Sequence, residues 1–161
     1  MQKPKITTLK EKKLSGMAIQ TSLSENRTKD LWQNFISILP HIRDRIGTDF
    51  YSVQQYSDPF VPNEFTPLTV FTKWAAVEVS DFSVVPENAK LIIPAGKYAV
   101  FIYRGTPDEF HKMASYIYGE WLPKSEYQLD NRPHFEIMTK DYNPNDPNSE
   151  EEVWIPIKLK T

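Results

Sequence analysis

The chain has 161 residues, and its 19 Lys and Arg are balanced by 21 Asp and Glu, so it carries no excess of positive charge. This balance argues against nucleic acid as a direct partner. The absence of cysteine excludes a disulfide framework and a thiolate metal site. No run is apolar and long enough for a signal peptide or a membrane span. We therefore expect one domain, residues 1–161, in the cytoplasm, without a cofactor or a membrane partner.

The first half of the sequence predicts one helix and three strands. Residues 14–23 alternate as a half-buried strand does, and residues 28–39 repeat apolar side chains at helical spacing, between a Thr suited to capping and a Pro. Residues 50–56 and 69–79 are rich in β-branched and aromatic side chains, which favours two more strands. Three prolines within residues 57–67 predict an extended loop between them.

The second half predicts the same order of elements. Residues 91–105 form a long strand that is apolar on both faces. Thr-Pro-Asp-Glu at residues 106–109 predicts a helix that starts with a capping box, and a Leu-Pro step ends this helix at residues 122–123. Residues 133–139 and 153–158 form the two closing strands.

The two halves share landmarks at nearly constant spacing. Gly16 and Gly96 are 80 residues apart, Trp74 and Trp154 are also 80 apart, and the Leu-Pro steps that end the helices are 83 apart. Chance likeness between two ordinary α+β segments is the alternative to an internal repeat. We predict an α+β fold with a tandem pseudo-repeat of two β-α-β-β units, antiparallel sheets, two main helices on one side and a ligand cleft between the units. Repeat one covers about residues 5–80 and repeat two about residues 89–160.

Glu136 is an acidic residue between apolar neighbours in a predicted strand. An unpaired carboxylate is costly to bury, so three interpretations stay open. Glu136 attracts a lipophilic cation, with help from surrounding aromatic rings; or burial raises its pKa and it acts as a general base or acid; or it points to solvent or pairs with a Lys or Arg of a neighbouring strand.

Four stretches resemble the gyrase-inhibitor-like, or AraC-type effector-binding, superfamily: IPAGKYA at residues 93–99, WLPKSEY at 121–127, RPHFE at 132–136 and EVWIPI at 152–157. The resemblance implies a tandem β-α-β-β fold around a cleft that binds hydrophobic, often cationic, small molecules, with a buried Glu facing the ligand. Glu136 falls on that Glu. Family members fused to transcription regulators carry a DNA-binding helix-turn-helix, for which no residues remain here. In the family a Gly commonly stands before the aromatic residue of the second stretch, whereas here Ser-Glu precedes Tyr127.

We expect the ligand to lie against the strand face that holds His134, Glu136 and Met138. Tyr51, Trp74 and Trp154 are further candidates because they lie on strands, whose second face is free of the helices. The full set of ligand-binding candidates is Tyr51, Phe71, Trp74, Tyr103, His134, Glu136, Met138 and Trp154. His134 beside Glu136 invites a metal interpretation, but the other histidines lack supporting spacing, so we expect no metal site.

The leading interpretation of function is a stand-alone module that binds a hydrophobic, possibly cationic, small molecule without a DNA-binding domain of its own. One alternative is a hydrolase of electrophilic small molecules in which Glu136 activates water as a general base; otherwise no catalytic residue is expected. The other alternative is a protein-interaction module of the gyrase-inhibitor type, which would give the chain a protein partner.

Overall fold

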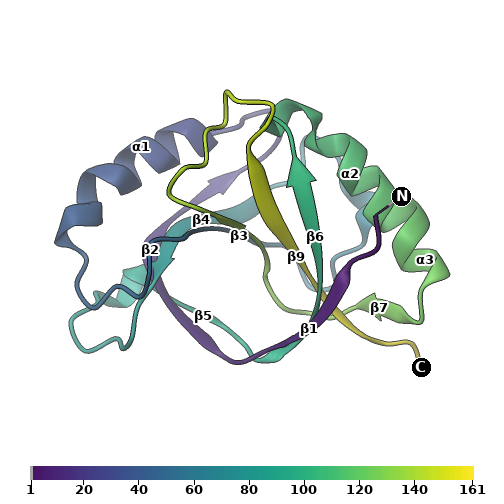
Figure 1. Cartoon of the computed structure of the whole chain (residues 1–161), viewed down its shortest axis with the longest axis horizontal. Helices are drawn as coiled ribbons and strands as arrows, with labels where there is room; N and C mark the ends of the chain where they lie inside the picture. Colours follow the sequence, from purple (N-terminus) through teal and green to yellow (C-terminus); the bar gives the residue numbers. More distant parts are fainter. Residues whose placement is uncertain (1) are drawn as a thin grey trace.

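The computed structural model describes residues 2–161 as a curled antiparallel sheet with two helices over one face (Figure 1). The strands of the described chain are β1 (Lys5–Leu9), β2 (Lys12–Thr21), β3 (Phe50–Gln55), β4 (Phe71–Glu78), β5 (Lys90–Ile93), β6 (Gly96–Arg104), β7 (Tyr127–Leu129), β8 (His134–Met138) and β9 (Glu150–Leu159). The helices are α1 (Thr28–Ile38), α2 (Phe110–Tyr116) and α3 (Leu122–Lys124), and a π-helical segment, Ile117–Trp121, joins α2 to α3. Short 3₁₀ turns lie at Leu39–His41, Pro62–Glu64, Glu87–Ala89 and Pro107–Glu109. The predicted α+β class, with antiparallel strands and two main helices on one side, is confirmed.

The strands of the two halves meet in the middle of the sheet. The order along the sheet is β1-β6-β9-β8-β3-β4-β2-β5, and β7 pairs separately with β9. Each half orders its strands in the same way, as β2-β4-β3 and as β6-β9-β8, and the halves join where Val53 of β3 pairs with Phe135 of β8. An origin by duplication stays a prediction.

The two edge strands are exchanged between the halves. β1 precedes β2 in the chain but pairs with β6, and β5 precedes β6 but pairs with β2. We did not predict β1, because its charged and polar side chains resemble a solvated segment; its pairing with β6 supplies the stability that its own sequence lacks. The predicted strand 91–105 is in fact β5 and β6, because the chain changes partner at residues 94–95.

The predicted capping box at the second helix is wrong. Residues 107–109 form a 3₁₀ turn, and α2 begins only at Phe110. The Thr106 side chain makes no capping hydrogen bond; instead its carbonyl accepts a hydrogen bond from the Tyr103 hydroxyl. The tighter first turn therefore replaces the α-helical geometry that a capping box requires.

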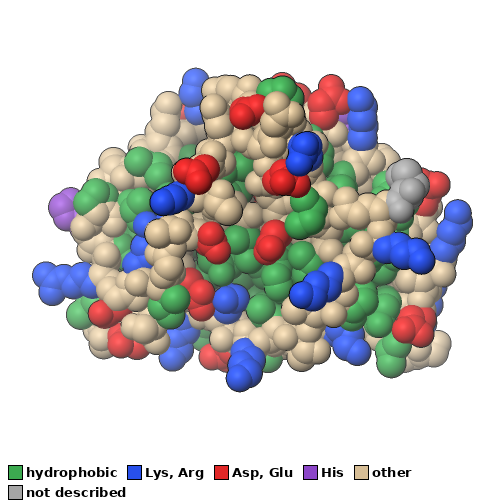
Figure 2. Space-filling view, viewed as in Figure 1, with side chains coloured by type: hydrophobic (Ala, Val, Ile, Leu, Met, Phe, Trp, Pro, Cys, Tyr) green, Lys and Arg blue, Asp and Glu red, His purple; other side chains and the backbone are tan. Residues whose placement is uncertain are grey.

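The two faces of the sheet bury different cores. On the helix face, Leu31 and Phe35 of α1 pack on β4, and Ile117 packs on β6 and β9. On the opposite face, an aromatic cluster forms around Phe135, which stacks on Trp154 at a ring distance of 5.2 Å. In the view of Figure 2, hydrophobic side chains gather near the centre of the molecule, and basic side chains alternate with acidic ones around them.

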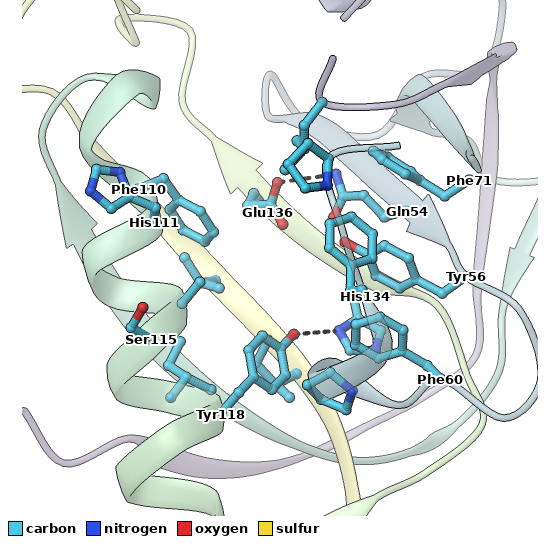
Figure 3. A pocket seen from close by; sticks show the side chains of 18 of the residues that line it. Gln54, Tyr56, Phe60, Phe71, Phe110, His111, Ser115, Tyr118, His134 and Glu136 are labelled. Carbon is cyan, nitrogen blue, oxygen red and sulfur yellow. Dashed lines mark hydrogen bonds between the residues drawn. The ribbon is translucent and has the colours of Figure 1, made fainter. Parts of the chain in front are cut away.

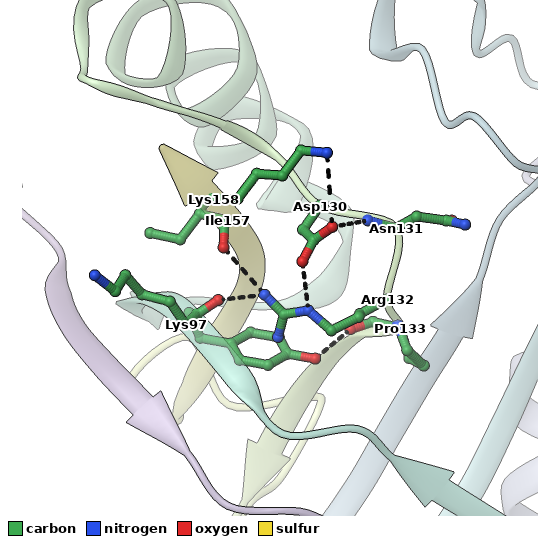
Figure 4. A network of polar contacts seen from close by, with 8 residues as sticks. Lys97, Asp130, Asn131, Arg132, Pro133, Ile157 and Lys158 are labelled. Carbon is green, nitrogen blue, oxygen red and sulfur yellow. Dashed lines mark hydrogen bonds and ion pairs between the residues drawn. The ribbon is translucent and has the colours of Figure 1, made fainter. Parts of the chain in front are cut away.

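Arg132 ties the start of β8 to three neighbouring segments (Figure 4). Its guanidinium donates to the carbonyls of Lys97 at 2.7 Å and Ile157 at 3.0 Å and pairs with Asp130 at 3.0 Å. It also lies 4.6 Å from the centre of the Tyr98 ring. A Cβ at Gly96 would come within 2.4 Å of this guanidinium, so the glycine provides the room that the network needs.

Candidate functional site

A cavity of about 850 Å³ lies between the two halves, on the helix face of the sheet. Figure 3 shows Phe110, His111, Ser115 and Tyr118 projecting from the second-half helix on one side. The other wall comes from β3, β4 and the proline-rich loop that joins them, and includes Tyr56, Phe60, Phe65, Pro67 and Phe71. The volume falls within the range of pockets that hold drug-sized molecules.

Glu136 is the acidic residue of the β8 surface that lines this cavity. Its Oε1 accepts a hydrogen bond of 3.2 Å from the Gln54 amide, which also donates to the Ser52 hydroxyl at 3.2 Å. Burial raises the pKa of Glu136 to about 7, although Lys73 and the Gln54 hydrogen bond both lower it. A small change in its surroundings therefore decides whether this carboxyl is charged near neutral pH.

Two further ionisable groups lie near Glu136. Lys73 of β4 lines the cavity, where burial lowers its pKa while Glu136 and Glu151 raise it. Burial, followed by the charge of Glu136, raises the pKa of Glu151 on β9 to about 8. Since no carboxylate of the described residues lies within 4.0 Å of the Lys73 ammonium, these groups interact by charge without forming an ion pair.

His134 forms the aromatic end of the cavity together with three other rings. Its Nδ1 lies 3.0 Å from the Tyr118 hydroxyl, and its ring contacts Tyr56 and Phe60 edge-on, at ring distances of 5.0 and 5.3 Å. Burial lowers the pKa of His134 to about 3, so the imidazole is neutral at physiological pH. The cavity therefore has a charged end at Glu136 and an uncharged aromatic end at His134.

Of the eight candidate residues, the structure brings Glu136, His134 and Phe71 together in the cavity. Tyr51, Trp74 and Trp154 instead pack in or against the aromatic cluster on the opposite face of the sheet. Side chains alternate along a strand, so Trp74 must point away from the face that holds Lys73. The strand face free of helices is thus filled by aromatic core rather than open to a ligand.

The remaining two candidates lie on the correct face but outside the cavity. Tyr103 packs against Phe110 at a ring distance of 5.2 Å, within the core beneath α2. Met138 is buried next to its β3 partner, Phe50, beyond the end of the cavity.

Several cavity residues were not among the candidates. Gln54 and Lys73 could have been found by counting in steps of two along their strands from Tyr56 and Phe71. Phe60 and Phe65 lie in an irregular loop without any periodicity, so no sequence pattern indicated their direction. Within residues 2–161 no cluster of three His, Asp or Glu side chains is placed to hold a metal ion.

An antiparallel sheet that curls beneath two helices, with a pocket between its halves, places the chain in the class of α+β domains with a central cavity. The model of the GyrI-like small molecule binding domain matches residues 2–158, so the chain belongs to the GyrI-like family. No helix in the described part of the chain has the length and hydropathy required to cross a bilayer.

A curated relative is the transcriptional regulator BrlR of Pseudomonas aeruginosa, which is 33% identical over 85 residues. That match covers 52% of this chain and 32% of BrlR, so the chain spans about a third of the relative.

Solved structures share the fold at low identity. One is SAV2435 bound to tetraphenylphosphonium, with a TM-score of 0.73, 12% identity and coverage of 98% of this chain and 94% of that one. Another is the EcmrR C-terminal domain, with a TM-score of 0.70, 14% identity and coverage of 97% of both chains. A hydrolase encoded by lin2189 of Listeria innocua has a TM-score of 0.57 and 12% identity, with coverage of 97% and 92%.

Proposed function

We propose that the chain binds a hydrophobic, cationic small molecule in the cavity, with the Glu136 carboxylate as the counter-charge. The observation that carries this proposal is a half-buried carboxylate at the polar end of a cavity of about 850 Å³ that is otherwise lined mainly by aromatic and aliphatic groups. The membership of the GyrI-like family and the tetraphenylphosphonium bound to SAV2435 agree with it.

The chemistry of the cavity favours a delocalised cation over a small, strongly hydrated one. A lipophilic cation gives up little hydration on entering, and its apolar groups fill the aromatic end near Phe60 and Tyr118. Its charge stabilises the ionised form of Glu136, which burial otherwise disfavours. The aromatic end of the cavity supplies the apolar contacts and the Glu136 carboxylate supplies the opposite charge, and a lipophilic cation uses both.

Tetraphenylphosphonium is the appropriate first probe, because it is a permanent cation without exchangeable protons. We expect saturable binding of one molecule by isothermal titration calorimetry. Glu136→Gln should weaken it about 5- to 30-fold, since a desolvated charge interaction of roughly 1 to 2 kcal/mol is lost while the size of the side chain is kept.

Glu120→Gln is the matched control, because Glu120 is exposed and does not line the cavity. Its affinity for tetraphenylphosphonium should equal that of the wild type. Equal losses in both variants, or unchanged binding in Glu136→Gln, would contradict a role for the Glu136 charge.

A hydrolase of electrophilic small molecules is the second candidate. A carboxyl with a pKa of about 7 is suited to accept a proton from water at neutral pH, and the hydrolase from Listeria innocua shares the fold. With styrene oxide as the probe, water would attack a ring carbon and give a proton to Glu136 while the C–O bond breaks. The alkoxide left on the ring oxygen would take a proton from solvent to give the diol, and Glu136 would return its proton to solvent. Many turnovers per chain, lost in Glu136→Gln, would support this candidate. Turnover that persists in Glu136→Gln, or consumption of one equivalent only, would count against it.

The domain organisation and the cellular location of the protein are also proposals. The transcriptional regulator BrlR and the EcmrR–DNA complex each contain more chain than the part matched here. We propose that this chain acts as a single ligand-binding domain in the cytoplasm, in agreement with its lack of cysteine.

A further inference from the structure

Lys73 places a positive charge inside a cavity that we expect to hold cations. Its side chain lines the cavity from β4, where its backbone pairs with Gln54, and it is only partly exposed. Within residues 2–161 its ammonium has neither a carboxylate within 4.0 Å nor a hydrogen-bond acceptor. The ammonium is not sealed off from the open space of the cavity, so a bound molecule that displaced water from it would have to supply an acceptor. The Lys73 ammonium is therefore available to a molecule in the cavity.

Two carboxylates act on this ammonium from the other half of the sheet. Glu136 lies on β8 and Glu151 on β9, and the charge of each raises the pKa of Lys73 against the larger, opposing effect of burial. Lys73 lowers the pKa of both carboxyls in return. One ammonium is thus within electrostatic reach of two acids but paired with neither, which leaves room for a ligand with charges of both signs.

We propose that Lys73 is a specificity-determining residue that selects amphoteric ligands, meaning aromatic cations that also carry a carboxylate. The cationic part would lie against Glu136, and the carboxylate would accept a hydrogen bond from the Lys73 ammonium. A simple monocation satisfies Glu136 but is repelled by Lys73 and leaves its ammonium without an acceptor. This inference rests on the proposed function, because it requires the ligand cation at Glu136.

Rhodamine B and its ethyl ester form a matched pair of probes. Both contain the same cationic ring system, but only rhodamine B has a free carboxylate. We expect the wild type to bind rhodamine B about tenfold more tightly than the ester, as measured by fluorescence anisotropy, because a charge-assisted hydrogen bond to Lys73 is available to one probe only.

Substitution of Lys73 should change the two affinities in opposite directions. Lys73→Met should weaken rhodamine B about tenfold and strengthen the ester, whereas Lys73→Arg, which keeps the charge, should retain the preference of the wild type. Lys29→Met is the control, since Lys29 is exposed and outside the cavity. Circular dichroism establishes that each variant is folded, and Lys73→Gln replaces Lys73→Met if the latter unfolds.

The possible failures separate this inference from the proposed function. Equal affinities of the wild type for the two dyes, or equal changes for both dyes in Lys73→Met, would overturn the role of Lys73. Binding of tetraphenylphosphonium but of neither dye would overturn it as well and leave the proposed function intact. No binding of any of the three cations would overturn both.

Discussion

Tetraphenylphosphonium is expected to bind at least about tenfold more weakly at pH 6 than at pH 9. Burial raises the pKa of Glu136 to about 7 and of Glu151 to about 8, so both carboxyls gain a proton and lose their charge as the pH falls through this window. For each carboxyl that must be ionised, affinity falls about tenfold per pH unit below its pKa. The measurement is a series of calorimetric titrations between pH 6 and pH 9.

The other groups around Glu136 either act in the same direction or do not titrate in this range. Burial lowers the pKa of Lys73, so loss of its proton at high pH removes a competing charge and also favours the ligand. The pKa of His134, about 3, keeps this ring neutral throughout. The other titratable groups that interact with Glu136 are Glu151 and the tyrosines Tyr56, Tyr118 and Tyr142, whose pKa values are raised by burial; Gln54, its hydrogen-bond partner on β3, does not titrate.

Two variants test which group causes the pH dependence. In Glu136→Gln the slope of affinity against pH should become shallower, because only Glu151 and Lys73 remain. In His111→Asn, which removes the other imidazole that lines the cavity, the slope should be retained. If the slope of affinity against pH is kept in Glu136→Gln and lost in His111→Asn, the pH dependence comes from His111 and the role of Glu136 is contradicted.

The raised pKa values of Glu136 and Glu151 also determine how the stability of the free protein changes with pH. Each of these carboxyls has a folded pKa above its unfolded value of about 4.5, so the folded state binds more protons between that value and pH 7 to 8. Their contribution to stability is complete below about pH 4.5 and is lost as the pH rises through 7 to 8. Bound tetraphenylphosphonium offsets this loss, so the rise in Tm that it causes should be larger at pH 9 than at pH 6.

Phe135→Ala should destabilise the protein by about 4 kcal/mol, the largest effect on stability that we expect from a single substitution. Phe135 has no exposed surface, stacks on Trp154 at 5.2 Å and contacts Tyr98 at 5.2 Å and Tyr51 at 5.9 Å. Its removal leaves a cavity that three rigid rings fill poorly. Thermal unfolding should show a Tm lowered by about 10 °C.

The control for this truncation is Leu68→Ala, because Leu68 is 77% exposed. It should change the free energy of unfolding by less than about 0.5 kcal/mol. Phe135 points away from the cavity, so Phe135→Ala should still bind tetraphenylphosphonium well below its Tm. Loss of binding by the folded variant, or a Tm like that of the wild type, would contradict the separation of the two faces.

The main helices, the central strands and the position of Glu136 could be predicted from the sequence because they depend on local periodicity, whereas β1 and β7 carry no such pattern. Alternation along one strand places His134 and Glu136 on one face whatever the rest of the fold does. Which face of a strand lies under the helices depends on the tertiary fold. Trp74 and Trp154 turned out to lie on the opposite face, away from the cavity. Tyr118 lies on the same helical stripe as Phe110 and Ala114, at i, i+4 and i+8, so the spacing carried a signal for it, but the sequence did not show that this stripe faces a cavity.

The exchanged edge strands have a consequence for how a ligand enters. Because β1 is held by β6 and β5 by β2, the two halves are fastened to one another at both margins as well as along the β3–β8 seam. A hinge motion that parted the halves would have to break strand pairing at several places at once. The cavity is partly open to solvent, so a ligand can enter without any parting of the halves. We expect the segment from Phe60 to Pro67, which forms a wall outside the sheet, to be the part that adjusts to ligands of different size.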